Sequence, residues 1–310
     1  METSSKDVLF TIAMNLDLPS LLRWSSSDSR INRNVYNNES LWRSMLLRDY
    51  PDYQIFNLHR SLREIYIFLY QLSYIKNLLN TSESLYDILQ KRVLDMSKKE
   101  LKKVLTFDLP NLRVLFLSNN LLTEVPKFTL LNLRVLDLSK NLLTKVPAFE
   151  FPNLERLTLD DNRLTEVPAF DLPNLKILNL SNNRLTEVPS FKLSNLKVLN
   201  LSINHLSEIP VFNLPNLEEL YMDNNRLTEV PTYLFVLPNL KTLSLSSNQL
   251  TTVSAFHLPA LQLLNLNNNL LTEVPTFYFP NLQRLYLSVN HLSEEEKRLL
   301  QQEYGNKINL

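Results

Sequence analysis

The sequence predicts an α/β solenoid of short, stacked parallel strands, preceded by a small all-α module. Two observations predict this fold. A leucine pattern returns about every 21 residues through the last two-thirds of the chain. Residues 1–50 have a different pattern, in which apolar positions recur at helical spacing.

The repeating unit is seen in NLRVLFLSNNLLTEVPKF, which returns as NLRVLDLSKNLLTKVPAF and NLERLTLDDNRLTEVPAF. One asparagine closes each regular unit: Asn120, Asn141, Asn162, Asn183, Asn204, Asn225, Asn248, Asn269 and Asn290. The step is 21 residues, except for 23 between Asn225 and Asn248. We expect the two extra residues, within VPTYLFVLPNL, to bulge on the convex side. Upstream, VLDMSKKELKKVLTFDL keeps the spacing with Lys99 at the asparagine position, which indicates a degenerate first repeat.

Alternation within VLFLS turns Leu115 and Leu117 to one face of a short strand and Phe116 to the other. A single unit buries too little apolar surface to offset the entropy of ordering its backbone, so the units must stack. The closing asparagines should form an internal ladder that satisfies backbone groups where the strands end. Prolines in VP and LPN favour extended or turn conformations. We therefore expect a parallel sheet on the concave side and a mostly coil or 3₁₀ convex side.

This pattern resembles the leucine-rich repeats of short-repeat intracellular proteins. The resemblance covers residues 91–292, as about nine regular repeats and one degenerate repeat. It implies a binding module that uses its concave sheet, performs no catalysis and needs no cofactor. Residues 293–310, which begin with the capping sequence SEEE, are expected to form a helical cap at the C-terminal end.

The outward strand positions are the candidate target-binding face. One outward column is mostly serine and the next one is mixed, so the charged and aromatic residues in and beside these columns are the informative ones. They are Phe116, Asp137, Arg156, Asp160, Asp161, Tyr221, Asp223 and Tyr286. The aspartates predict a local acidic patch, and exposed aromatics often anchor interfaces. We expect this face to take a polypeptide with some basic character; a plain solvated polar face is the alternative.

Residues 1–50 contain three short amphipathic patterns, DVLFTIAMNL, DLPSLLRWSS and ESLWRSMLLRDYP. A proline near the start of the second pattern suits the first turn of a helix. Residues 51–90 continue with helical spacing in LHRSLREIYIFLYQLSYIKNLL and SESLYDILQKR, and no glycine-rich linker separates them from the repeats. These connecting helices should join the front module to the first repeat.

The front module resembles an F-box. The family's first helix matches Asp7, Val8, Leu9 and Ile12. Further matching residues lie in LDLPSLL and in NESLWR, at the separation found in that family. The leading Leu-Pro of the family is absent, and SSDSRIN stands where the family has a basic core ending in tryptophan. The resemblance implies that the module binds a Skp1-like adaptor. The residues that would make this contact are Leu9, Ile12, Leu16, Leu18, Pro19, Leu22 and Trp42.

Composition excludes several classes of function. The formal net charge is +0, which argues against bulk attraction to nucleic acid or membrane. Cysteine is absent and Gly305 is the one glycine, so disulfides and a glycine-rich phosphate loop are excluded. The four histidines have no metal-ligand spacing. The first residues make a poor signal peptide. We expect a monomer in the cytoplasm or nucleus that is not secreted.

The sequence therefore predicts a non-catalytic protein-binding module. The leading hypothesis is a substrate receptor of an SCF-type (Skp1–cullin–F-box) ubiquitin ligase, which binds Skp1 through its N-terminal helices and a target on the concave face. The alternative is a non-ligase scaffold, such as a phosphatase-regulator-like or decoy protein, whose front helices only cap the solenoid. The asparagine-rich, glycine-poor repeats also resemble proteins of giant DNA viruses, in which case the adaptor would belong to the host.

Overall fold

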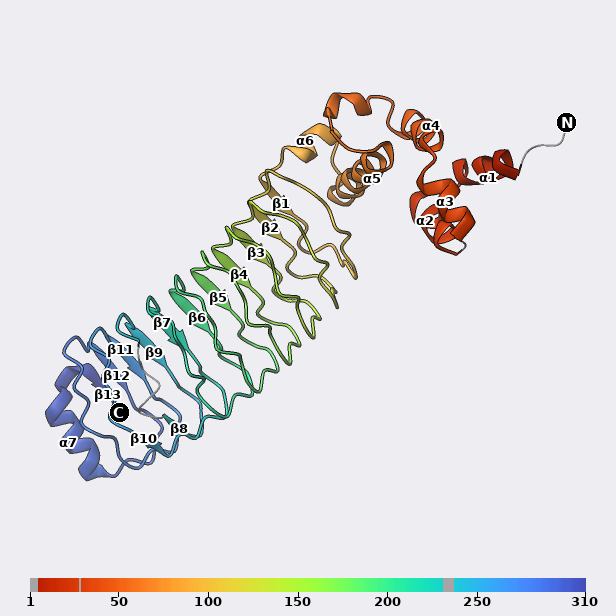
Figure 1. Cartoon of the computed structure of the whole chain (residues 1–310). Coiled ribbons are helices and arrows are strands. Elements are labelled where there is room, and N and C mark those ends of the chain that lie inside the picture. Colours follow the sequence, from red (N-terminus) through yellow and green to blue (C-terminus); the bar gives the residue numbers. More distant parts are fainter. Residues whose placement is uncertain (1–4, 28, 231–236) are drawn as a thin grey trace. The chain divides into compact units, whose positions relative to one another are not determined.

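The computed structural model describes residues 5–27, 29–230 and 237–310 (Figure 1). It divides into two compact units. The helical unit runs up to Lys91 and includes residues 105–109, and the solenoid comprises residues 92–104 and 110–310. The two units are described separately below.

The helical unit contains six α-helices and one 3₁₀ turn in its described residues. They are α1 (Ser5–Met14), α2 (Leu18–Ser26), α3 (Ser29–Tyr36), α4 (Glu39–Asp49), η1 (Tyr53–Phe56), α5 (Leu62–Leu79) and α6 (Leu85–Leu89). Side-chain hydrogen bonds cap the N-termini of several of these helices. Asp17 accepts a hydrogen bond from the Ser20 amide at the start of α2, and Ser61 forms a capping box with Glu64 at the start of α5. The predicted all-α character of this region is confirmed.

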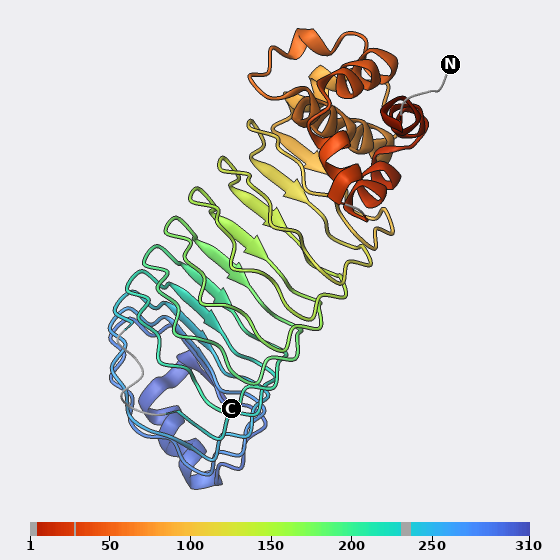
Figure 2. The same ribbon diagram turned by 45° about the vertical axis from the view of Figure 1, so that its right-hand side comes forward.

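The solenoid is a parallel sheet with one short strand per repeat (Figure 2). The strands are β1 (Val93–Asp95), β2 (Val114–Phe116), β3 (Val135–Asp137), β4 (Arg156–Thr158), β5 (Ile177–Asn179), β6 (Val198–Asn200), β7 (Glu219–Tyr221), β9 (Thr242–Ser244), β11 (Leu263–Asn265), β12 (Arg284–Tyr286) and β13 (Ile308–Asn309). In β1 to β12 of this sheet the middle residue is a buried leucine, as alternation predicts. A second, two-stranded parallel sheet pairs β8 (Glu229–Val230) with β10 (Thr252–Val253). In the described residues the return segments are otherwise coil and turns, and the predicted solenoid is confirmed.

The asparagine ladder is confirmed in atomic detail. Asn183 is representative: its Nδ2 donates to the carbonyls of Leu159 and Leu180, both at 3.0 Å. Its Oδ1 accepts the amide of Leu164 at 3.0 Å. The residue before each ladder asparagine has a positive φ, for example 50° at Asn182 and 55° at Ile203. This left-handed residue turns the chain from the strand into the ladder.

Besides the β8–β10 pair, three features of the solenoid were not predicted. A second, exposed asparagine ladder runs through the LPN turns, where Asn174 Nδ2 donates to the carbonyl of Pro152 at 2.8 Å. Buried phenylalanines stack on the return side, with Phe149, Phe170 and Phe191 rings about 6 Å apart (6.2 and 6.1 Å). After the C-terminal helix α7 (Glu294–Tyr304), β13 adds a final strand beside β12. The expected bulge falls on residues 231–236, outside the described part of the chain.

Candidate protein-binding faces

The face of the parallel sheet presents aligned columns of side chains. Strand register places Phe116 beside Asp137 and Asp137 beside Thr158, so residues 21 apart form one column. Arg156 lies in the neighbouring outward column, at the start of β4. Asp160 and Asp223 each follow a strand by two residues, and Asp161 lies at the next position with a φ of 54°. Each of these side chains is at least partly accessible.

The predicted residues form one cluster and several separate positions. Phe116, Asp137, Arg156, Asp160 and Asp161 lie on or just after β2 to β4 and gather at the N-terminal part of the solenoid. The other predicted residues, Tyr221, Asp223 and Tyr286, lie on or near β7 and β12. The intervening strands β5 and β6 separate the two groups. The aromatics therefore do not make one continuous surface.

The acidic patch is held by internal hydrogen bonds. Asp137 accepts from the Thr158 hydroxyl at 2.9 Å and from the Ser139 hydroxyl at 2.7 Å. Asp160 accepts from Asn179 Nδ2 at 3.0 Å. Burial raises the pKa of Asp160, and the negative charges of Asp161 and Asp137 raise it further. The patch is thus built into the sheet face, with its carboxylates already partly satisfied.

Asp and Asn side chains also close turns at the ends of the strands, which was not predicted from the sequence. Asp137, Asn179 and Asn200 each accept the backbone amide two residues later, at 3.0, 3.1 and 3.0 Å. Such bonds close an Asx turn at the end of the strand. Asp223 instead accepts the Ser246 amide of the next repeat at 2.9 Å. The signal was present in the sequence, because the column holding Asp137 repeatedly contains Asp or Asn.

The Tyr221 ring is held by a hydrogen bond to its own strand. Its hydroxyl donates to Glu219 Oε2 at 2.8 Å. Burial, followed by this hydrogen bond, raises the pKa of Tyr221 to about 12. The phenol therefore stays neutral at physiological pH and presents a fixed, partly exposed ring, a form of aromatic that suits a protein contact.

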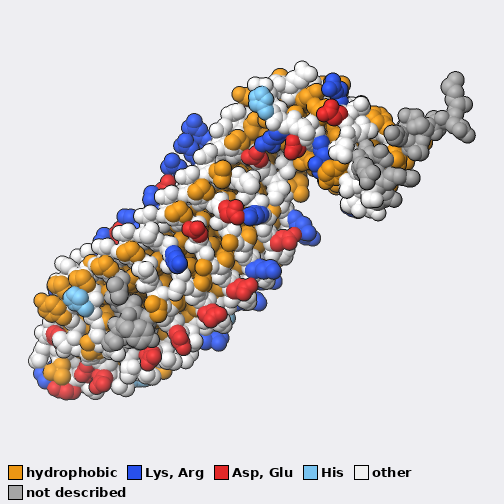
Figure 3. Space-filling view, viewed as in Figure 1, with side chains coloured by type: hydrophobic (Ala, Val, Ile, Leu, Met, Phe, Trp, Pro, Cys, Tyr) orange, Lys and Arg blue, Asp and Glu red, His pale blue; other side chains and the backbone are white. Residues whose placement is uncertain are grey.

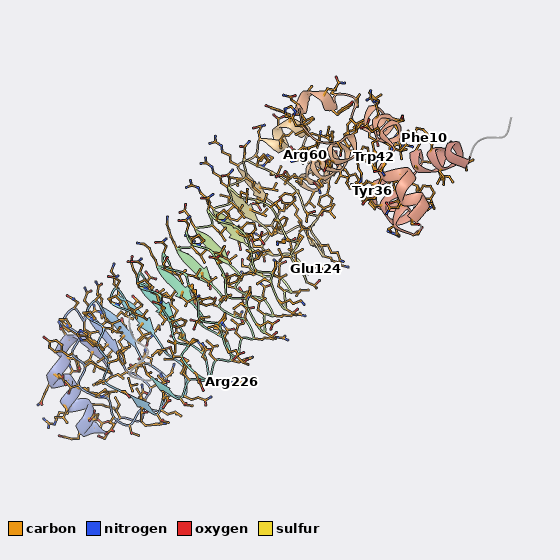
Figure 4. All side chains as sticks on the ribbon, in the orientation of Figure 1. Phe10, Tyr36, Trp42, Arg60, Glu124 and Arg226 are labelled. Atoms are coloured by element: carbon orange, nitrogen blue, oxygen red, sulfur yellow. The ribbon has the colours of Figure 1, made fainter. Side chains whose placement is uncertain are left out.

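A second edge of the solenoid holds a column of glutamates, with arginines three residues before several of them. Glu124 and Arg226 mark this edge, beyond the ladder asparagines (Figure 4). Glu124 pairs with Lys103 of the preceding repeat at 3.3 Å. Among the described residues, the arginines at 163, 184 and 226 form no ion pair with the glutamates three residues later. Within the described part of this glutamate column, the ion pair thus joins neighbouring repeats, through Glu124 and Lys103.

The residues predicted to meet an adaptor divide into exposed and buried groups. Ile12 on α1 is 42 % exposed, and Pro19 on α2 is exposed too. Leu9, Leu16 and Leu22 are half-buried. Leu18 and Trp42, in contrast, belong to the core of the helical unit.

Trp42 organises that core (Figure 4). Its indole nitrogen donates to the carbonyl of Val35 at 3.0 Å, and its ring lies 5.8 Å from that of Tyr66. The Tyr66 hydroxyl donates to Asp49 Oδ2 at 2.6 Å. Trp42 thus ties α4 to α3 and α5, and it supports the helix surface from within.

The described residues offer no group of three His, Cys, Asp or Glu side chains that could hold a metal ion. None of the described helices is long and apolar enough to cross a membrane. The arrangement is suited to binding: aligned polar and aromatic columns on a rigid sheet, and an exposed apolar row on the first helices.

Comparison with known proteins shows that the chain belongs to the leucine-rich-repeat family. A leucine-rich-repeat family model matches residues 110–151, 152–193 and 194–234, and a second leucine-rich-repeat model matches 215–271. No curated protein matches the chain. YopM, a leucine-rich effector protein from Yersinia pestis, is 27 % identical, with a TM-score of 0.61, over 72 % of this chain and 66 % of its own. InlP from Listeria monocytogenes is 28 % identical, with a TM-score of 0.54, over 69 % of this chain and 68 % of its own.

Proposed function

The chain is a leucine-rich-repeat protein, a protein-interaction scaffold, and we propose that it is the substrate receptor of an SCF-type ubiquitin ligase. In this proposal the helical unit binds a Skp1-like adaptor, and the sheet face of the solenoid holds the target protein. The chain itself carries out no chemistry. It would act in the cytoplasm or nucleus, where the ligase operates.

One observation carries the ligase proposal. The two F-box-like motifs, LDLPSLL and NESLWR, fall on α2 and α4 of a compact all-α unit, and α1 leaves apolar side chains in solvent. Val8 and Ile12 are 45 % and 42 % exposed on α1. An isolated end cap would gain by replacing such residues with polar ones, whereas a docking helix needs them.

The adaptor surface that we propose consists of the accessible members of the predicted set: Leu9, Ile12, Leu16, Pro19 and Leu22. Leu18 and Trp42 would act from the core by holding α2 and α4 in place. Arg48 of α4 adds to this support, because its guanidinium donates to the carbonyl of Met14 at the end of α1. The adaptor would therefore meet helices whose positions are fixed before binding, which reduces the entropic cost of association.

The target surface that we propose is the cluster on β2 to β4. Phe116 supplies an apolar anchor beside Asp137, and the carboxylates of Asp160 and Asp161 supply negative charge. A target segment with a basic and an apolar residue would complement this surface. Tyr221 and Tyr286 would contribute only to a target long enough to cross several repeats.

A scaffold without ligase activity is the second candidate. The burial of Leu18 and Trp42 favours it, since both residues are explained by the core of the helical unit alone. The similarity to YopM, a leucine-rich effector protein, covers the repeats and is equally compatible with a scaffold. In this case the helices would serve the first repeat as a cap.

A pull-down with purified Skp1 separates the two candidates. The full chain should retain Skp1, and an Ile12→Ser/Pro19→Ala variant should lose it, because both side chains are accessible and lie outside the core. Val211→Ser is the matched control, since Val211 is 59 % exposed on the solenoid. Circular dichroism would verify that each variant keeps its helix content. If the unmodified chain does not bind Skp1, the ligase proposal is rejected and the scaffold without ligase activity is the remaining candidate.

A further inference from the structure

The position just before each strand forms a row of charged residues along one long edge of the solenoid. Figure 3 shows Lys and Arg side chains following one another along such an edge, with few acidic ones between them. In chain order the row is Arg92, Arg113, Arg134, Glu155, Lys176, Lys197, Glu218, Lys241, Gln262 and Gln283. This edge is opposite to the one that the ladder asparagines occupy, since the asparagines follow the strands.

Two glutamates in this row each bridge the cations of both neighbouring repeats. Glu155 pairs with Arg134 at 3.2 Å and with Lys176 at 2.7 Å. Glu218 pairs with Lys197 at 2.8 Å and with Lys241 at 2.7 Å. These two lysines lower the pKa of Glu218 to about 2. A carboxylate between two cations is therefore the arrangement that the row itself uses to balance its charge.

The first part of the row lacks such a carboxylate. Within the described chain, Arg92 and Arg113 form no ion pair, and Arg134 shares its single partner with Lys176. The three arginines line a polar groove of about 210 Å³ together with Asn111, Asn132 and Asn153. All three arginine side chains are exposed.

The backbone holds these arginines side by side. The Arg92 carbonyl accepts the amides of both Arg113 and Val114, at 2.8 and 3.0 Å, and the Arg113 carbonyl accepts the Arg134 amide at 2.7 Å. Neighbouring strands lie about 4.8 Å apart, so like charges on them repel. The groove thus fixes three positive charges at strand spacing, and no carboxylate of the described residues lies between Arg92 and Arg113 or between Arg113 and Arg134 to offset their repulsion.

We propose that the groove of Arg92, Arg113 and Arg134 binds an acidic segment of a partner polypeptide, whose carboxylates take the place that Glu155 and Glu218 take farther along the row. Guanidinium groups bind carboxylates through paired, charge-assisted hydrogen bonds. Asn132 and Asn153, which also line the groove, each donate one amide hydrogen bond to the preceding repeat, so the exposed asparagine ladder holds the polar wall of the groove in place. This surface belongs to the solenoid alone and does not depend on the ligase proposal.

The row disfavours an extended polyanion such as nucleic acid. Glu155 and Glu218 recur along the edge and would repel a continuous line of phosphates. The chain as a whole has a formal net charge of +0, so it provides no long-range field for such a ligand. A short acidic stretch needs only the three arginines before Glu155.

Fluorescence anisotropy with a labelled oligo-glutamate peptide tests the proposal on the full chain. We expect binding that weakens between about 50 and about 200 mM salt, and none by an oligo-glutamine peptide of the same length. Arg92→Gln/Arg113→Gln should lower the affinity at least about tenfold. Arg163→Gln/Arg184→Gln removes the same charge from the opposite edge and should change it less than about twofold.

Arg113→Glu separates binding from folding. It places a carboxylate between Arg92 and Arg134, as Glu155 lies between its two cations, so binding should be lost while the unfolding midpoint stays the same or rises. The proposal is overturned if the unmodified chain does not bind the peptide, or if the two double variants bind it equally well. Displacement by inorganic phosphate at concentrations equal to the peptide would also overturn it, because that would show a simple anion site.

Discussion

Replacing Asn183 with alanine tests how the solenoid is held together. The side chain is 6 % exposed and sits in the middle of the ladder. Its bonds join two repeats: it donates to the carbonyls of Leu159 in the preceding repeat and Leu180 in its own, and it accepts the amide of Leu164 in the preceding repeat. Each ladder carbonyl is shared, since Leu159 also accepts from Asn162 at 3.0 Å.

These bonds set the size of the expected effect. Without Asn183, the carbonyls of Leu159 and Leu180 each keep one neighbouring ladder asparagine as a donor, Asn162 and Asn204. The amide of Leu164 loses Asn183 Oδ1 as its acceptor and stays buried, which costs about 1–3 kcal/mol. The two lost carbonyl bonds add about 0.5–1.5 kcal/mol each. We expect Asn183→Ala to lower the free energy of unfolding by about 3 kcal/mol.

Asn174→Ala is the matched control, because it removes an asparagine of the outer ladder in the same repeat. Asn174 is exposed, so water can replace its bond to Pro152, and the loss should be about 1 kcal/mol or less. Urea unfolding followed by circular dichroism gives both free energies, and hydrogen exchange should show lost protection at the Leu164 amide in Asn183→Ala alone. Equal costs for the two variants would refute the reasoning.

Three further substitutions give distinct outcomes. Ile203→Asn should stabilise the chain by about 1 kcal/mol in urea unfolding, since a β-branched residue is strained at a φ of 55°; no gain would show that the turn tolerates it. Trp42→Ala should lower the local stability of the helical unit by about 3–5 kcal/mol, seen as faster amide exchange in α4 and α5. Asp160→Asn should raise stability at about pH 7, and the gain should vanish near pH 3. The raised pKa of Asp160 means that its contribution is favourable at low pH and is lost as the pH rises and the group ionises, so a gain independent of pH would contradict this reasoning.

Features that depend on one residue at a fixed spacing were predictable. The ladder followed from an asparagine at the same place in each repeat, and the inward strand leucines followed from alternation. The exposed ladder did not, although its asparagines were visible in the LPN turns. Asn174 bonds a carbonyl 22 residues earlier, and that partner comes within reach only when the repeats stack.

The candidate sites were predictable only in part, because residue type does not show whether a side chain faces the core or the solvent. Leu18 and Ile12 are both apolar at helical spacing, yet one is buried and the other is 42 % exposed. The sequence suggested that Asp137 offers an unpaired negative charge, whereas its carboxylate accepts the Ser139 amide in a turn. The arginine groove was missed although Arg92, Arg113 and Arg134 recur at the 21-residue step, because the position before each strand was not compared between repeats.

The most direct test of the central claim is a calorimetric titration of the full chain with purified Skp1. The account predicts saturable binding at one Skp1 per chain, lost in Ile12→Ser/Pro19→Ala and kept in Val211→Ser. A titration without heat of binding, with Skp1 and the chain eluting separately in gel filtration, would contradict the receptor assignment.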